Sequence, residues 1–244
     1  MPRSVPASVS EISFPEEYLP VLKQAPDLIL KSYKQHGPPI ESGIVSIDND
    51  DPSFKVAMFL FHWIYETNDI IDNLNLVLSD LRDLPNDHVL FKGSPAKRFY
   101  LLLRTFFHEF YRFRETFNTF VKMAATRGHL NAEDVKPLRE SFHSTFEGAI
   151  KMRNTLVHDS PVWKGHDHFE LSVFASAWEL DMQMAWRETG EKRDISYALS
   201  KICPKTADEL QGEAVRVSKL TSLVIHTIAT AAHERSTQDQ KRAV

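Results

Sequence analysis

The stretch SPAKRFYLLLRTFFHEFYRFRETFNTFVKMAATR, residues 94–127, decides the fold class of this 244-residue chain. It opens with Ser94-Pro95, which is typical of a helix N-cap followed by proline at the first helical position, and it stops before Gly128, a residue type that commonly ends helices. Its apolar side chains recur at alternating intervals of four and three residues, so they share one helical face. These residues are Phe99, Leu103, Phe106, Phe110, Phe113, Phe117, Phe120 and Ala124. Such an unbroken seam predicts core packing rather than a cofactor site.

Similar start and stop signals predict helices over most of the remaining chain. The expected helices run from Asp51-Pro52 to about Leu81, from Asn131 to near Asp159 with a possible kink at Pro137, from about Asp167 to Gly190, and from Thr206, after a break at Pro204, until the helix fades before Arg235. Few windows alternate with period two, and only eight glycines are present, so hairpins are not expected. The sequence therefore predicts an all-α, up-and-down helical bundle.

Three regions are expected along the chain. Residues 1–50 contain seven prolines and predict an irregular N-terminal arm with at most short helices and a short extended piece at 44–47. Residues 51–235 form the predicted bundle, and residues 236–244 form a frayed C-terminal tail.

Composition bounds the class of protein. The chain is 42% hydrophobic and 25% charged, which suits a sizeable core. Its single cysteine, Cys203, excludes an intramolecular disulfide framework and a Cys-rich zinc site, and we interpret it as structural. No apolar signal segment is visible, and the most apolar run, residues 56–65, is too short to span a membrane. We therefore expect a soluble, cytoplasmic protein with no membrane partner.

Charge is unevenly distributed. The net charge of −4 argues against indiscriminate coating of nucleic acid. Residues 92–127 contain eight Lys or Arg and two Glu, whereas residues 48–87 contain nine acids and two basic residues. This asymmetry predicts a local basic face; ordinary solvated helix faces are the alternative.

The most unusual residue is Arg153, in the run Arg153-Asn154-Thr155-Leu156-Val157-His158. On a helical wheel it falls at the centre of an apolar stripe made by Leu138, Phe142, Phe146, Ala149, Leu156 and Val157. An arginine occupies such a place only when it is paired, or when the stripe faces something other than a dry core. His158, one turn after Asn154, is of the side-chain type that titrates near neutral pH.

These residues suit the handling of a phosphodiester. Metal-free RNA cleavage needs a base for the 2′-hydroxyl, an acid for the leaving oxygen and a cation for the charge on phosphorus. His158 suits the base or acid, and both the helix dipole and Asp159 favour its imidazolium form. The planar fork of Arg153 matches phosphate oxygens. Asn154 is expected to orient the imidazole or to donate to the phosphate.

Four further residues are candidates for RNA contact. Lys151 lies close to the motif and would add phosphate affinity, and Trp163, just after the motif helix, would stack on a base. Arg104 and Arg112 lie on the predicted basic face. The structural alternative is that Arg153 pairs with a buried acid and that His158 bonds the last helical carbonyls.

Arg-Asn-x-x-x-His late in a long helix of an all-α domain resembles the signature of the HEPN superfamily, many of whose members are ribonucleases of toxin–antitoxin and other defence systems. The resemblance implies a bundle of four or five helices, covering about 52–234, that dimerises through its motif helices. It further implies a composite site in which Arg and His of two protomers cut RNA without a metal or other cofactor, leaving a 2′,3′-cyclic phosphate. By motif, Arg153, Asn154 and His158 carry over, and Asp159 follows the histidine as in some members.

The resemblance implies RNA, a second copy of the chain and an antitoxin or regulatory protein as partners. It does not explain the N-terminal arm or the acidic stretch 48–87. Two alternatives stay open: a non-catalytic HEPN module that binds RNA, a nucleotide or a protein, and a helical scaffold without nucleotide chemistry.

Two groups of residues are possible metal ligands, but neither group predicts a metal site. His158, His166 and His168 lack an obvious fourth zinc ligand. Asp69 and Asp72, with Glu66 before them, lack the second facing acidic pair that a magnesium site would need. Helical spacing favours a core position for Trp178.

Overall fold

The computed structural model describes residues 8–36, 51–90, 92–158, 166–185, 187 and 189–242. For most of 29–36, and for 150–158, 166–168 and 236–242, the description is of the backbone alone. These residues are helical nearly throughout, which confirms the predicted all-α helical bundle. The expected extended piece at 44–47 lies outside the described residues.

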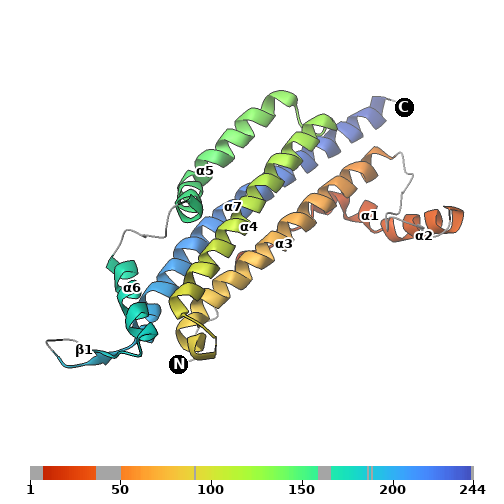
Figure 1. The fold of residues 1–244 in the computed structure, drawn as a ribbon. Helices are drawn as coiled ribbons and strands as arrows, with labels where there is room; N and C mark the ends of the chain where they lie inside the picture. Colours follow the sequence, from red (N-terminus) through yellow and green to blue (C-terminus); the bar gives the residue numbers. More distant parts are fainter. Residues whose placement is uncertain are drawn as a thin grey trace. The chain divides into compact units, whose positions relative to one another are not determined.

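The long helices are α3, α4, α5 and α7 (Figure 1). The elements are η1 (Glu16–Tyr18), α1 (Leu19–Leu22), α2 (Ala25–His36), α3 (Pro52–Asp87), η2 (His88–Leu90), α4 (Pro95–Thr126), α5 (Ala132–His158), α6 (His166–Glu179), β1 (Met184–Ala185), β2 (Lys192–Arg193) and α7 (Ile195–Arg242). The two short strands pair antiparallel, with Met184 opposite Arg193 and Ala185 opposite Lys192.

The chain divides into two compact units, and the division passes through α3, α4, α5 and α7. Unit 1 consists of Met1–Glu11, Asp69–Glu115 and Glu140–Ser218. Unit 2 consists of Ile12–Asn68, Thr116–Arg139 and Lys219–Val244.

The predicted phenylalanine seam forms the buried face of α4. Each of its eight members, from Phe99 to Ala124, is at most 6% exposed. In unit 1 the seam packs against α5, where the Phe110 and Phe146 ring centroids lie 5.1 Å apart and those of Phe113 and Phe142 lie 6.4 Å apart. The seam is therefore confirmed as core packing.

The core of unit 2 is also aromatic. Trp63 on α3 stacks nearly parallel on Phe120 of α4, with ring centroids 5.5 Å apart, and Phe59 contacts the same phenylalanine at 5.8 Å. Arg235 of α7 donates to the carbonyl oxygens of Gly128 and His129 at 2.6 and 2.9 Å. This arginine therefore satisfies carbonyls at the C-terminal end of α4.

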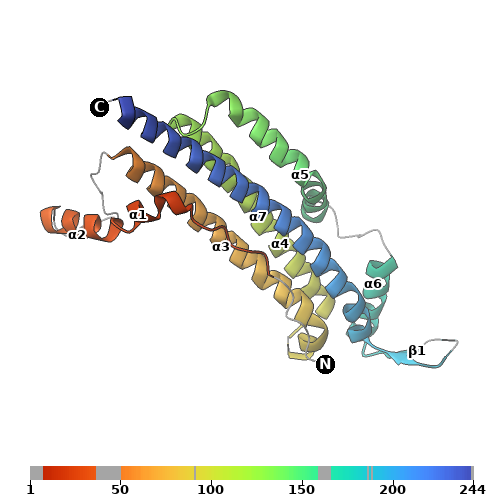
Figure 2. The same ribbon diagram turned by 180° about the vertical axis from the view of Figure 1, so that it is seen from behind.

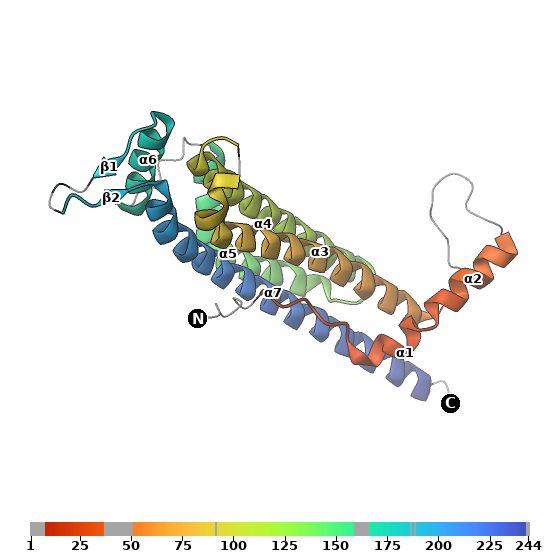
Figure 3. The same cartoon turned by 90° about the horizontal axis from the view of Figure 1, so that it is seen from below.

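The extended segment before η1 lies along α3 and α7 (Figures 2 and 3). In unit 1, Asn75 exchanges two hydrogen bonds with the backbone of Val9, and the Ser218 hydroxyl donates to the Ser10 carbonyl at 2.9 Å. In unit 2, Asn68 makes the same reciprocal pair with Ile12. This part of the predicted arm is therefore held by specific side chains.

The boundaries predicted for three helices were wrong. Helix α3 continues past Leu81 to Asp87, and α7 runs from Ile195 to Arg242 without a break at Pro204 and beyond Arg235. Pro204 is exposed, while the buried residues continue through it at helical spacing, as Ile202, Cys203, Thr206, Ala207 and Leu210. Burial of this face outweighs the cost of about 3 kcal/mol for a proline in a helix interior.

The third error concerns α6, which ends at Glu179 rather than near Gly190 and is followed by the hairpin. Asp181 adopts a φ of 53°, while its N–H donates to the Trp178 carbonyl and the Met182 N–H donates to the Ala177 carbonyl. This is a Schellman motif, which usually has glycine at the left-handed position. Because Asp181 is not a glycine, the end of α6 could not be recognised from the sequence. Trp178, expected in the core, is 43% exposed here.

Candidate functional site

Helix α5 carries the Arg-Asn-x-x-x-His run on its last turns, because it continues from Ala132 to His158 (Figure 1). Asn131 precedes the helix, and its side-chain amide donates to the Asp134 carboxylate at 3.2 Å. Pro137 lies within the second turn, where it does not interrupt the helix. The predicted motif helix is therefore confirmed at both ends.

The core-facing stripe of α5 is established as far as residue 149. Phe142, Phe146 and Ala149 are buried, and the two phenylalanine rings lie 4.2 Å apart. Arg153 comes four residues after Ala149 in the same helix, but its side chain lies outside the described residues. The same holds for the side chains of Lys151, Asn154 and His158, and Asp159 and Trp163 lie wholly outside the description.

The opposite face of α5 is polar and faces solvent. Glu140, His143, Glu147 and Gly148 are exposed. Glu140 and Glu147 are seven residues apart and Lys151 follows Glu147 by four, so these three residues share one side of the helix. The helix thus separates a buried apolar stripe from an exposed polar face up to the turn before the motif.

The two arginines predicted to bind RNA differ in their surroundings. Arg104 is exposed on α4. Arg112 is 37% exposed, and its guanidinium contacts the carboxylates of Asp69 at 2.7 Å and Glu109 at 3.2 Å. Burial acts against the charge of Arg112, but the hydrogen bonds and charges of Asp69 and Glu109 outweigh it and raise the pKa of Arg112.

Some acids of residues 48–87 form ion pairs with basic residues of 92–127 on the neighbouring helix. In unit 1 the acidic helix α3 faces the basic helix α4, with Asp69 paired to Arg112 at 2.7 Å and Asp80 paired to Arg98 at 3.9 Å. The predicted basic face is therefore reduced, because some of its cations contact the acids of the preceding helix.

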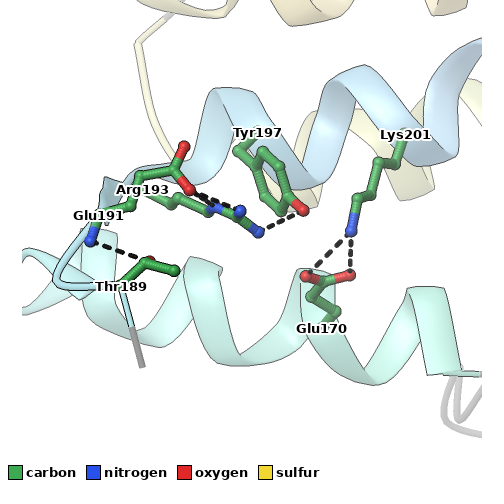
Figure 4. A network of polar contacts seen from close by, with 6 residues as sticks. All are labelled: Glu170, Thr189, Glu191, Arg193, Tyr197 and Lys201. Atoms are coloured by element: carbon green, nitrogen blue, oxygen red, sulfur yellow. Dashed lines mark hydrogen bonds and ion pairs between the residues drawn. The ribbon is translucent and has the colours of Figure 1, made fainter. Parts of the chain in front are cut away.

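A polar network joins α6 and β2 to α7 within unit 1 (Figure 4). Glu170 of α6 is buried and lies 3.4 Å from the Lys201 ammonium of α7. The Tyr197 ring has the Arg193 guanidinium 4.0 Å and the Lys201 ammonium 4.3 Å from its centroid. Arg193 also donates to the Tyr197 hydroxyl and pairs with Glu191 at 2.7 Å.

The network is compensated in charge. The hydrogen bond to Tyr197, together with that to Glu170, raises the pKa of Lys201 against the effect of desolvation. Each cation has a carboxylate partner, so the arrangement suits attachment of α6 and the hairpin to α7. Sequence reasoning missed it, although Tyr197 and Lys201 are four residues apart, which places them on one side of α7.

No metal centre is evident in the described part of the chain. Among those residues, no group of three or more His, Cys, Asp or Glu side chains is placed to hold a metal ion. Asp69, a member of the acidic group weighed for magnesium, contacts Arg112 instead. The side chains of His158, His166 and His168 lie outside the described residues.

Two further findings bear on the class of protein. None of the helices in the described ranges is both long enough and apolar enough to cross a membrane. Comparison of the chain with models of protein families, with curated proteins and with solved structures found no match in any of the three.

Proposed function

We propose that this protein is a metal-independent endoribonuclease of the HEPN type, with a composite site formed by Arg153 and His158 of two protomers. The observation that carries the proposal is that α5 extends unbroken to His158. Arg153, Asn154 and His158 therefore occupy the last two turns of a long helix in an all-α bundle, which is the context in which the HEPN motif occurs.

The roles follow from the chemistry of the residues. Arg153 binds the phosphate and compensates the charge that develops on phosphorus, while His158 transfers a proton to or from the reacting oxygens. The negative end of the α5 dipole favours the charged imidazolium of His158. Asn154 and Asp159 act in support by orienting the imidazole.

A second copy of the chain suits the position of Arg153. Ala149, four residues earlier, is buried, so an arginine that continues the same stripe needs a partner or a wet surface. A two-fold contact between motif helices would bring two such arginines and two histidines together around one phosphate. An antitoxin or regulatory protein would then act by covering or separating these helices.

The experiment is an RNA cleavage assay in EDTA, with product ends identified by mass spectrometry. We expect a 2′,3′-cyclic phosphate from the wild type and a loss of at least about 100-fold in rate for His158→Ala, the scale of general acid–base catalysis. Arg153→Lys should retain more activity than Arg153→Ala, because a point charge still binds phosphate. His143→Ala, on the exposed face of the same helix, is the matched control and should cleave normally.

Other outcomes favour the alternatives. RNA binding without cleavage, unaffected by His158→Ala, would indicate the non-catalytic HEPN module. Effects of the motif substitutions on stability alone would indicate a scaffold without nucleotide chemistry.

A further inference from the structure

Helices α4 and α5 run antiparallel in unit 1, which relates the motif to one part of α4. Phe142 contacts Phe113, and Phe146 contacts Phe110, so residue numbers fall along α4 as they rise along α5. At 1.5 Å per residue on both helices, continuing this register by seven residues brings the turn of Arg153 level with about residue 103 of α4. Arg104 therefore lies at the axial level of the motif, and Arg112 lies two turns away from it.

The exposed face of α4 near this level combines an arginine and a histidine with an aromatic ring. At 100° per residue, Arg104, His108 and Tyr111 fall within an arc of about 60°. Arg104 and His108 are exposed, and Tyr111 is 39% exposed. Arg114 lies about 60° further around the helix from Tyr111, and its guanidinium is 5.8 Å from the Tyr111 ring centroid. We name Arg104, His108, Tyr111 and Arg114 the α4 outer strip.

The strip is distinct from the side of α4 that faces α3. Arg112 lies about 80° around the helix from Arg104 and contacts Asp69 and Glu109. The strip ends one turn beyond Tyr111, where Glu115 lies 4.0 Å from Arg114. Its cationic part therefore covers the turns that begin at the level of the motif.

We propose that the α4 outer strip binds single-stranded RNA and guides it to the motif at the end of α5, an inference that rests on the proposed ribonuclease function. Exposed cations contact the phosphate backbone, and an exposed tyrosine ring stacks on a base. Stacking favours unpaired RNA, because the bases of a duplex are not available to the ring. Arg114 adds positive charge beside Tyr111 and binds a phosphate of the same strand.

The structure thus separates Arg104 from Arg112, which the sequence places on one basic face. Arg104 binds RNA, whereas Arg112 joins α4 to α3. This separation is measurable because one substitution should change RNA affinity and the other should change stability.

The test is fluorescence anisotropy with a labelled single-stranded RNA of mixed sequence, using full-length protein that carries His158→Ala so that the probe stays intact. We expect Arg104→Ala and Tyr111→Ala each to weaken binding about tenfold, while Tyr111→Phe, which keeps the ring, binds like its parent. Arg104→Ala should also reduce the salt slope by about 0.7 for each phosphate that the variant no longer neutralises. Arg112→Ala should change the affinity less than about twofold while lowering thermal stability.

Lys122→Ala is the matched charge control, because Lys122 is exposed eighteen residues further along α4 from Arg104. The proposal is overturned if Arg112→Ala or Lys122→Ala weakens binding as much as Arg104→Ala, if Tyr111→Phe is as weak as Tyr111→Ala, or if duplex RNA binds better than the single strand. Absence of any RNA binding overturns it as well. Strip-dependent binding by a wild type that cuts no RNA would refute the nuclease and leave this inference standing.

Discussion

Asn75 holds the peptide backbone of Val9 from both sides: the Val9 N–H donates to its Oδ1 at 2.8 Å, and its Nδ2 donates to the Val9 carbonyl at 3.0 Å. Val9 as a whole residue is 2% exposed, so little water can replace the Asn75 amide as a partner of these backbone groups if the amide is removed. Residues 8–12 are thus part of the folded protein, although the prolines of residues 1–50 suggest an irregular arm.

We therefore expect Asn75→Ala to lower the free energy of unfolding by about 1–3 kcal/mol, because two backbone groups would then have no hydrogen-bond partner. Urea denaturation monitored by circular dichroism measures the change. Asn86→Ala, at an exposed position of the same helix, is the control and should have little effect. Equal stability of Asn75→Ala and the wild type would show that the segment is not held as described.

Pro204 lies inside α7, where it removes one backbone donor. Since Pro204 is exposed and its neighbours are buried, Pro204→Ala should keep the core and gain about 1–3 kcal/mol in stability. Chemical denaturation is the measurement. A loss of stability would mean that α7 needs the bend that proline introduces.

Asp181 takes the left-handed position that ends α6, where a side chain is unfavourable. Asp181→Gly should stabilise the protein by about 0.5–1 kcal/mol, and Asp181→Val should destabilise it, because β-branched residues rarely adopt positive φ. Gly128, which ends α4 at a φ of 74°, provides the reverse comparison: Gly128→Ala should be destabilising. Thermal melts of the three variants test whether Asp181 and Gly128 occupy left-handed positions. The assignment would be refuted if Gly128→Ala left the stability unchanged and Asp181→Gly lowered it.

Cys203 is buried in α7, and this burial raises the pKa of its thiol to about 12. A folded pKa above the unfolded value means that the stabilisation is complete below about pH 9 and is lost as pH rises toward 12. Through this group the free energy of unfolding should fall by up to about 1.4 kcal/mol per pH unit. Cys203→Ala should flatten the loss of stability above pH 9 in urea titrations.

Thiol reagents give an independent readout for the same residue. The native protein should react very slowly at pH 8, because its thiol is both buried and protonated. Reaction should follow global unfolding in urea. Rapid alkylation of the native protein would contradict the burial of Cys203.

Regular patterns in this sequence predict regular structure well. The phenylalanine seam from Phe99 to Phe120 predicted α4 and its buried face, because periodic burial is a local property of the chain. The start of α5 followed from Asn131, and its end followed from Pro161, which biases the preceding Ser160 away from helical angles. Where an unfavourable residue was outweighed by packing around it, as at Pro204, or took a glycine position, as at Asp181, local rules gave the wrong boundary.

The candidate site also contains residues that local patterns predict and residues that they do not. Arg153, Asn154 and His158 could be selected from spacing alone, since the motif lies in one helix. The difference between Arg104 and Arg112 could not, because it depends on Asp69, which is distant in sequence and adjacent in space. The network around Tyr197 also joins α6 and α7, so no single window reveals it.

The central claim is tested most directly by the rate at which purified protein cuts single-stranded RNA in EDTA, compared between the wild type and a folded His158→Ala variant. The account predicts metal-independent cleavage by the wild type that falls by at least about 100-fold in the variant. Equal rates in the two proteins, or no cleavage by a wild type shown to be dimeric, would contradict it.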